Sequence, residues 1–225
     1  MAEKSDNQYI ALARKYRPQT FEDLLGQDAL VQTLTNAIQN NRLHHAYILT
    51  GIRGVGKTTT ARLIARAINC IGADGKGGPT IHPCGECENC KAIAEDRHID
   101  VIELDAASKT GVDDMREILD GVRYKPVSAR YKVYIIDEVH MLSKSAFNAL
   151  LKTLEEPPAH VKFIFATTEI RKVPVTILSR CQRFDLERLS IETLMTLFKK
   201  VLTAEKIDFD DEALRLIARA ADGSA

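Results

Sequence analysis

The stretch Gly51-Ile52-Arg53-Gly54-Val55-Gly56-Lys57-Thr58 decides the fold class, because it matches the phosphate-binding loop pattern GxxxxGK[ST] in full. An apolar run, Ala46-Tyr47-Ile48-Leu49, precedes it and is typical of a short buried strand. After it, apolar residues between Ala61 and Ile68 recur at helical spacing. The loop is therefore predicted to join a strand to a helix. A glycine-rich turn that only caps a helix is the alternative.

The chemistry of phosphate binding explains the order of these residues. Glycines let backbone N–H groups close around phosphate oxygens, and the start of the following helix adds unsatisfied donors and a positive dipole end. All residues from Gly51 to Thr58 are accordingly candidates for nucleotide binding. Lys57 is expected to reach the β- and γ-phosphates, and the Thr58 hydroxyl is expected to join the oxygen ligands of Mg²⁺.

A second apolar run, Val133-Tyr134-Ile135-Ile136, ends in the two acids Asp137 and Glu138. A buried strand of a parallel sheet delivers such carboxylates to the sheet's C-terminal edge. With a phosphate loop upstream, Asp137 is predicted to hold Mg²⁺ through water and Glu138 to polarise the attacking water. A plain strand followed by an acidic helix cap is the alternative. The two motifs predict hydrolysis of ATP, and GTP is less favoured because no Asn-Lys-x-Asp guanine motif is present.

The composition is that of an ordinary soluble enzyme. The 225 residues are 45% hydrophobic, which is enough for one large core and a small appendage. The 31 basic residues balance 31 acidic residues, so any contact with nucleic acid has to come from local clusters. The sequence has no stretch long enough to span a membrane and no apolar secretion signal after Met1. A cytoplasmic protein with no membrane partner is therefore expected.

Four of the five cysteines lie close together in the sequence: Cys70, Cys84, Cys87 and Cys90. In a reducing cytosol this spacing favours a metal site over disulfides, and thiolates favour tetrahedral Zn²⁺. Four sulfur ligands leave no open position, so the zinc is predicted to be structural. The polar segment 71–83 is rich in Gly and Pro, and a metal would supply its missing folding energy. The alternatives are four free thiols, or His82 in place of one sulfur.

Strands and helices alternate through most of the chain. Apolar patterns predict two further strands, at residues 100–104 and 161–166. They also predict two further helices, at residues 113–122 and 147–154. Pro157-Pro158 stops the last of these helices. This order implies an α/β fold with a parallel, doubly wound sheet flanked by helices and with ligands at the C-terminal edge of the strands.

The pattern changes near the end of the chain, because only helical periodicity is present from Ser190 onward. A domain boundary is therefore predicted near Leu189. Residues 1–189 are expected to form the nucleotide-binding domain, with the cysteine module at about residues 70–90, and residues 190–225 to form part of a small helical domain.

Further stretches carry a family resemblance, together with the phosphate loop and the cysteines: Ala13-Arg14-Lys15-Tyr16-Arg17-Pro18, Asp137-Glu138-Val139-His140-Met141-Leu142, Leu154-Glu155-Glu156-Pro157-Pro158 and Ser179-Arg180-Cys181. The chain resembles the AAA+ ATPases, specifically the clamp-loader branch and within it the gamma/tau subunits of bacterial DNA polymerase III. The resemblance covers essentially the whole chain. It implies an AAA+ P-loop NTPase fold with an inserted Cys₄ zinc module, followed by a helical lid domain.

The resemblance also implies roles for residues that patterns alone leave unassigned. Thr168 is expected to be the sensor that feels the γ-phosphate or orients the water, whereas on its own it is a hydroxyl at a strand end. Arg180 is expected to be an arginine finger inserted into a neighbouring subunit's ATP site, where a guanidinium neutralises the growing phosphate charge. Without the family it is a surface arginine. Cys181 is expected to pack as a small residue of the same motif.

The N-terminal segment resembles the part of these proteins that closes over adenine. Tyr16, Arg17 and Pro18 are the expected contacts, in a segment that continues to Gly26-Gln27. Pro18 fixes the chain, and Tyr16 can supply an apolar wall. By themselves these residues are typical of a loop packed on a helix.

The family's second sensor arginine follows a Gly-Ser element in the lid, which corresponds here to Asp222-Gly223-Ser224-Ala225. A truncated lid without that arginine, the oligomerising collar or a polymerase-binding tail is therefore expected, and neither Arg215 nor Arg219 is assigned the role. For DNA, Ser108-Lys109-Thr110 before a predicted helix is the best local candidate, and a plain helix cap is the alternative.

The implied function is that of the ATP-hydrolysing motor subunit of a DNA polymerase III clamp loader, part of a DNA-directed DNA polymerase. Its expected partners are other clamp-loader subunits in a ring, the sliding clamp and primer–template DNA, with polymerase and helicase as possible partners of a longer chain. Two alternatives stay open. One is a non-hydrolysing scaffold subunit, against which Lys57, Thr58, Asp137 and Glu138 argue. The other is a different AAA+ DNA remodeller, against which the cysteines argue.

Overall fold

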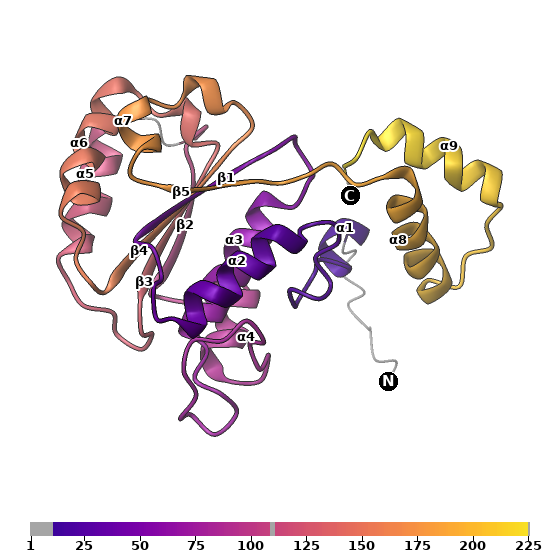
Figure 1. Ribbon diagram of the computed structural model, residues 1–225, viewed down its shortest axis with the longest axis horizontal. Helices are drawn as coiled ribbons and strands as arrows, with labels where there is room; N and C mark the ends of the chain where they lie inside the picture. Colours follow the sequence, from indigo (N-terminus) through magenta and orange to yellow (C-terminus); the bar gives the residue numbers. More distant parts are fainter. Residues whose placement is uncertain (1–10, 109–110, 225) are drawn as a thin grey trace, which may run out of the picture.

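The computed structural model describes residues 11–108 and 111–224, in which five parallel strands form one sheet with helices on both faces (Figure 1). The strand order is β2-β3-β4-β1-β5. The strands are β1 (Ala46–Thr50), β2 (Val101–Asp105), β3 (Lys132–Asp137), β4 (Val161–Thr167) and β5 (Gln182–Asp185). This arrangement confirms the predicted parallel, doubly wound sheet.

Helices connect the strands and continue beyond the sheet. The α-helices are α1 (Leu12–Lys15), α2 (Asp28–Gln39), α3 (Lys57–Asn69), α4 (Glu88–Ala94), α5 (Val112–Val122), α6 (Lys144–Glu155), α7 (Val175–Leu178), α8 (Ile191–Ala204) and α9 (Asp211–Ala221). Short 3₁₀ helices are η1 (Val139–Met141) and η2 (Ile170–Lys172). No helix in residues 11–108 or 111–224 is long and apolar enough to cross a membrane.

The sheet separates two hydrophobic cores because successive side chains of a strand point to opposite faces. In β4, Ile164 and Ala166 join the core that includes α2 and α3, whereas Phe163 and Phe165 join the core that includes α5 and α6. Every residue of β4 is buried, as expected for a central strand covered on both faces. Figure 1 shows the two helical layers on either side of the strands.

Strand register brings polar residues to a common edge of the sheet. Asp105 at the end of β2 pairs with Asp137 at the end of β3, and Thr50 at the end of β1 pairs with Thr167 at the end of β4. Because all the strands run in the same direction, these C-terminal ends meet at one edge. The phosphate loop follows Thr50 directly, so it begins at this edge as well.

Strand β5 was not predicted from the sequence. It pairs with β1 alone, at the edge of the sheet, and only Phe184 of its four residues is buried. A strand with a single apolar residue among polar ones gives no apolar run or repeat from which it could be predicted.

Helices α8 and α9 lie apart from the sheet, beyond an extended connection (Figure 1). The side chains of Ser190 and Asp210 accept hydrogen bonds from the first turns of α8 and α9, which stabilises both helix starts. The N–H of Leu189 donates to the carbonyl of Gly223 at 3.2 Å, so the two ends of this helical pair meet. The domain boundary near Leu189 stays a prediction.

Asp100 holds the connection between α5 and β3. Its side chain is buried, and its carboxylate accepts N–H bonds from Val127 at 2.8 Å, Ser128 at 2.8 Å and Ala129 at 2.9 Å. Burial alone raises the pKa of a carboxyl group, but these three N–H donors outweigh it and hold the pKa of Asp100 below its ordinary value. The charged form is therefore favoured in the folded protein.

Replacing Asp100 with asparagine is expected to lower the free energy of unfolding by about 2–4 kcal/mol at pH 7, because it breaks charge-assisted bonds to buried N–H groups. The pKa is depressed in the folded state, so this stabilisation is present above the unfolded-state pKa of about 3.9 and is lost as the pH falls through the folded-state pKa. Urea unfolding at pH 7 and near pH 3 measures both effects. Asp120→Asn, on the exposed face of α5, is the control, and equal losses in both variants would contradict the assignment.

Candidate nucleotide site and cysteine cluster

The predicted phosphate loop lies between β1 and α3. Gly54 and Gly56 have φ angles of 78° and 97°, a region that side chains with a Cβ rarely occupy. Helix α3 begins directly at Lys57, so its first backbone N–H groups have no partner within the helix. The loop therefore combines the backbone shape and the free donors that bind phosphate.

Ser224 lies against this loop. A Cβ added to Gly54 would come within 1.9 Å of the Ser224 Oγ, and such a contact is impossible without movement. Glycine at position 54 thus serves close approach as well as backbone shape. The segment after α9 reaches the phosphate loop, which places the Gly-Ser element of the predicted lid beside the predicted nucleotide site.

Lys57 is nearly fully buried, at 6% exposure. Its Nζ donates to the carbonyl of Gly51 at 3.1 Å and to that of Ile52 at 2.9 Å. Burial lowers the pKa of the Lys57 ammonium, and the carboxylates of Glu138 and Asp137 oppose that shift. The ammonium therefore lies inside the loop, held by two of the loop's own carbonyl groups.

Thr58 and Asp137 meet across the interface between α3 and β3. The Thr58 hydroxyl donates to Asp137 Oδ2 at 2.6 Å, and Asp137 Oδ1 accepts the backbone N–H of Glu138 at 2.8 Å. Two residues 79 positions apart in the sequence are thus in direct contact. Hydroxyl and carboxylate oxygens are ligands that Mg²⁺ accepts, so this pair fits a magnesium site.

Glu138 follows β3 in a left-handed conformation, with φ 45° and ψ 44°, which is uncommon for a residue other than glycine, asparagine or aspartate. Its Oε2 accepts hydrogen bonds from the N–H of Thr168 at 3.2 Å and from the Thr168 hydroxyl at 3.0 Å. The structure thus brings the predicted base into contact with the predicted sensor, just as it brings Thr58 into contact with Asp137.

His140 is a further member of this edge to which the sequence assigned no role. It lies on η1 with a side chain only 6% exposed. Its Nδ1 is 2.9 Å from Thr167 Oγ1 and 3.4 Å from Glu138 Oε2, and its Nε2 is 3.5 Å from Glu169 Oε1. Its place two residues after Glu138 is the one sequence feature that could have drawn attention to it.

Arg180 does not join the other predicted catalytic residues. Its guanidinium donates to the carbonyl of Thr176 at 2.7 Å and pairs with Glu155 at 2.6 Å. These partners belong to α7 and the end of α6, and the side chain is 32% exposed. The guanidinium is thus presented at a surface and makes no recorded hydrogen bond to the phosphate loop of its own chain.

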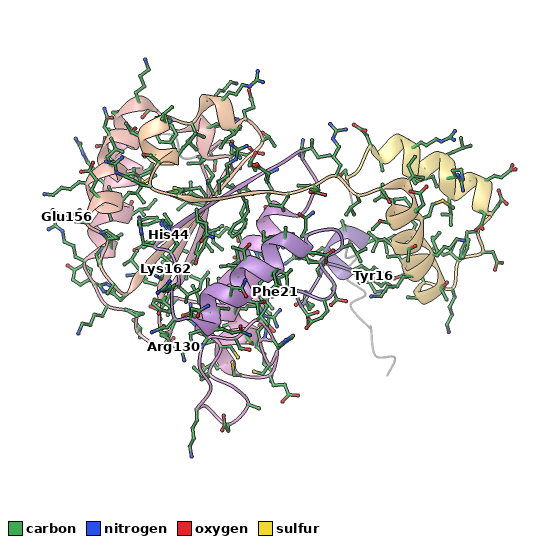
Figure 2. The ribbon with its side chains drawn as sticks, in the orientation of Figure 1. Tyr16, Phe21, His44, Arg130, Glu156 and Lys162 are labelled. Carbon is green, nitrogen blue, oxygen red and sulfur yellow. The ribbon has the colours of Figure 1, made fainter. Side chains whose placement is uncertain are left out.

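The predicted adenine segment connects α3 with the helical pair. The Tyr16 hydroxyl donates to Glu205 at 2.6 Å, and Lys15 pairs with the same carboxylate at the end of α8 (Figure 2). Arg17 and Pro18 lie around a small cavity together with α3 residues from Thr59 to Arg66. The segment therefore contacts both the helix that follows the phosphate loop and the predicted lid, and its contact with adenine stays a prediction.

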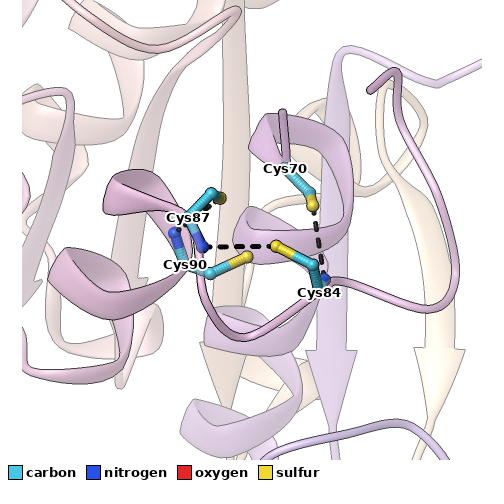
Figure 3. Close-up of side chains that lie close together, drawn as sticks. All are labelled: Cys70, Cys84, Cys87 and Cys90. Carbon is cyan, nitrogen blue, oxygen red and sulfur yellow. Dashed lines mark hydrogen bonds between the residues drawn. The ribbon is translucent and has the colours of Figure 1, made fainter. Parts of the chain in front are cut away.

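The four predicted metal ligands form one cluster, in which all the sulfurs lie within 4.8 Å of one another (Figure 3). Tetrahedral zinc with Zn–S bonds of about 2.3 Å needs sulfurs about 3.8 Å apart, so the donor set and its spacing fit this metal. Backbone N–H groups also approach the sulfurs, including Cys84 N at 3.4 Å from Cys70 Sγ and Cys87 N at 3.3 Å from Cys84 Sγ. Such bonds favour thiolates, the form that binds metal.

The thiols of the cluster lie in different environments, which shift their pKa values in opposite directions. Burial raises the pKa of Cys84, but the N–H groups of Cys87 and Glu86 outweigh it and bring the pKa down to about 7. Burial raises the pKa of Cys90 to about 12. His82 lies outside the cluster, 73% exposed at its side chain and paired with Glu22, so it does not replace a sulfur.

Side chains from elsewhere also hold the cysteine segment. Arg130 donates to the carbonyl of Ile68 at 2.8 Å and to that of Gly77 at 2.9 Å (Figure 2). Asn89 of α4 donates to the carbonyl of Asn69 at 2.9 Å. These backbone contacts were not predicted, because the sequence does not show which distant side chain meets a loop.

The predicted DNA stretch is only partly described. Ser108 donates to the carbonyl of Asp105 at 3.0 Å, whereas Lys109 and Thr110 lie outside the described residues. The role of this stretch stays a prediction.

Two family models match successive parts of the chain. A family model described as "DNA polymerase III, delta subunit" matches residues 26–190. A second model, "DNA polymerase III clamp loader subunit, ATPase lid domain", matches residues 194–225. The chain belongs to the clamp-loader subunits of DNA polymerase III. Among these subunits, it resembles those named tau and gamma.

Curated relatives of this clamp-loader subunit include the tau/gamma subunit of Haemophilus influenzae, 56% identical over 216 residues, and the tau subunit of Escherichia coli, 53% identical over 216 residues. The tau subunit of Bacillus subtilis is 51% identical over 215 residues. Each alignment covers 96% of the chain but only 31%, 33% and 37% of the respective relative. The chain thus spans about a third of the length of these three relatives.

Solved structures show the fold of this clamp-loader subunit. The RuvB Holliday junction branch migration motor of Thermotoga maritima has a TM-score of 0.64, with 20% sequence identity over 93% of the chain and 61% of that protein. Similarity at this level shows the shared AAA+ fold alone. The AAA+ fold implied by the family resemblance is thereby confirmed.

Proposed function

We propose that this chain is the ATP-hydrolysing part of a clamp-loader motor subunit, which loads a sliding clamp onto primed DNA in the bacterial cytoplasm. One observation carries the proposal: Thr58, Asp137, Glu138 and Thr168 meet beside the phosphate loop through direct hydrogen bonds. A scaffold that only binds nucleotide has no need of a positioned base. The relatives named tau and gamma support the clamp-loading role.

The residues divide the work of hydrolysis. The backbone of residues 51–58 and the Lys57 ammonium bind the phosphates of ATP, while the oxygens of Thr58 and Asp137 hold Mg²⁺. The metal neutralises charge on the phosphate oxygens when bound. Glu138 accepts the proton of the attacking water, and Thr168 holds the carboxylate of Glu138 and orients that water. Tyr16, Arg17 and Pro18 cover the adenine ring of ATP.

Arg180 completes the site of a neighbouring subunit. Its guanidinium lies at a surface beside α6 and α7, where it can neutralise γ-phosphate charge only across a subunit contact. Hydrolysis therefore depends on assembly with other clamp-loader subunits. We infer that ATP binding by this ring opens the clamp and grips primer–template DNA, and that hydrolysis releases the closed clamp.

The deciding experiment measures ATP turnover by the full-length protein with its partner subunits, with and without sliding clamp and primed DNA. Strong stimulation by clamp and DNA together is expected. Turnover that is indifferent to the clamp would instead assign the chain to another class of AAA+ remodeller. Binding of ATP without turnover would assign it to the scaffold class.

We infer that the cysteine cluster holds structural Zn²⁺. Replacing Cys90, whose side chain is fully buried, with serine is expected to release the metal and to lower the free energy of unfolding by at least about 3 kcal/mol, since structural zinc supplies folding energy. Metal analysis by mass spectrometry and urea unfolding measure the two effects. Cys181→Ser, which lies outside the cluster, is the control. Full metal content in Cys90→Ser would contradict the assignment.

A further inference from the structure

His140 is held tightly at the edge of the sheet, although nothing in the hydrolytic scheme above uses it. Its side chain is only 6% exposed, and its Nδ1 lies 2.9 Å from the hydroxyl of Thr167. Thr167 is itself fully buried in β4, and its Oγ1 also accepts the N–H of Glu169 at 3.0 Å. The imidazole ring therefore has one fixed orientation.

Two carboxylates flank this fixed ring. Glu138 Oε2 lies 3.4 Å from Nδ1, and Glu169 Oε1 lies 3.5 Å from Nε2. Lys172 pairs with Glu169 at 2.8 Å and so balances the outer carboxylate. Thr167 Oγ1 is the hydrogen-bond partner of Nδ1, and Glu138 Oε2 is close enough to the same nitrogen for a charge contact.

Within the described part of the chain, Oε2 makes the hydrogen bonds and the charge contact of the Glu138 side chain. Oε2 accepts both bonds from Thr168 and faces His140, whereas Oε1 has no hydrogen-bond partner among residues 11–108 and 111–224. The backbone of Glu138 is in an uncommon left-handed conformation that directs the side chain from η1 toward β4. Orientation of this carboxylate therefore depends on Thr168 from one side and on His140 from the other.

We propose that His140 is a positioning residue for hydrolysis. Buried Thr167 fixes the His140 ring, the ring helps to hold Oε2 of Glu138 in place, and Oε1 of Glu138 is left to accept the proton of water. The consecutive threonines at the end of β4 then act together. Thr168 binds the base directly, and Thr167 acts through the imidazole. This inference rests on the proposed function, because it assigns a role within the same hydrolytic site.

The test replaces His140 in the full-length protein and measures ATP turnover in the complete assembly. His140→Ala is expected to lower kcat about 10- to 100-fold while KM and ATP affinity change by less than about twofold, since a displaced base slows the chemical step and leaves binding intact. His140→Asn retains a polar atom near the position of Nδ1 and is expected to stay within about threefold of wild type. His140→Gln retains a polar atom near the position of Nε2 instead, and its kcat is expected to fall as far as that of His140→Ala.

His160→Ala is the matched control, because His160 is also partly buried and, within residues 11–108 and 111–224, its ring makes one hydrogen bond, to the carbonyl of Val122 at 3.2 Å. Wild-type kcat in His140→Ala would overturn the inference, and so would an equal loss in His140→Asn or a proportional rise in KM. If His140→Ala unfolds, the comparison of asparagine with glutamine decides the question. Glu138→Gln in the same series tests the proposed function separately. If the wild-type protein shows no turnover, both the proposed function and the role of His140 are overturned. If turnover is lost in Glu138→Gln but kept in His140→Ala, only the role of His140 is overturned.

Discussion

Replacing Glu138 with glutamine is expected to lower ATP turnover by the assembled full-length protein about 10²- to 10⁴-fold, because an amide cannot accept the proton of the attacking water. ATP affinity is expected to stay within about threefold of wild type, since the phosphate loop and Lys57 are unchanged. The amide can still accept the hydrogen bonds of Thr168, so the side chain keeps its place. Single-turnover hydrolysis and equilibrium binding of a fluorescent ATP analogue separate the two effects.

Glu156→Gln is the matched control, because Glu156, labelled in Figure 2, is an exposed carboxylate directly after α6. Its substitution should leave turnover and binding unchanged. Retention of turnover in Glu138→Gln would exclude the assignment of Glu138 as base. Loss of ATP binding would instead indicate that Glu138 shapes the phosphate loop.

Replacing Arg180 with alanine is expected to reduce turnover about 10³- to 10⁵-fold in the assembly, which is the range for arginine fingers supplied by a neighbour. ATP binding by each subunit should persist, because Arg180 makes no recorded contact with its own phosphate loop. The pair of Arg180 with Glu155 lies at the surface and contributes little to stability, so the variant should fold normally. Steady-state turnover and thermal unfolding check both statements.

Mixing two defective chains gives a sharper test of action in trans. Lys57→Ala removes ATP binding from a chain that still carries Arg180, whereas Arg180→Ala leaves an intact site. Assemblies that contain both chains should recover part of the turnover that each lacks alone. Arg183→Ala, on exposed β5, is the control for loss of a surface arginine. Absence of recovery, with mixed assembly verified, would contradict a trans role.

Much of the fold could be predicted because its central strands carry continuous apolar runs. β1, β3 and β4 are buried on both faces, so hydrophobicity alone marks them, and the phosphate loop and acidic pair follow two of them directly. The same reasoning missed β5, whose single buried residue, Phe184, leaves no periodic pattern. Burial on two faces makes a strand predictable, and exposure at an edge removes that pattern.

Site residues divide in the same way. Lys57 and Asp137 lie in local motifs, and strand register then brings them to one edge. The contact of Glu155 with Arg180 and that of Thr167 with His140 join positions 25 and 27 residues apart, respectively. No local pattern encodes such pairs, because they depend on how helices pack and where loops turn.

Helix α3 links two features that otherwise seem unrelated. It begins at Lys57 in the phosphate loop and is followed immediately by Cys70 of the metal cluster. At about 1.5 Å per residue, its 13 residues form a rod about 20 Å long. The far end of the helix is held by Arg130, which donates to the carbonyl of Ile68, and by Asn89, which donates to the carbonyl of Asn69. One helix thus joins the phosphate loop directly to the cysteine cluster, so the loop and the cluster share a single structural support.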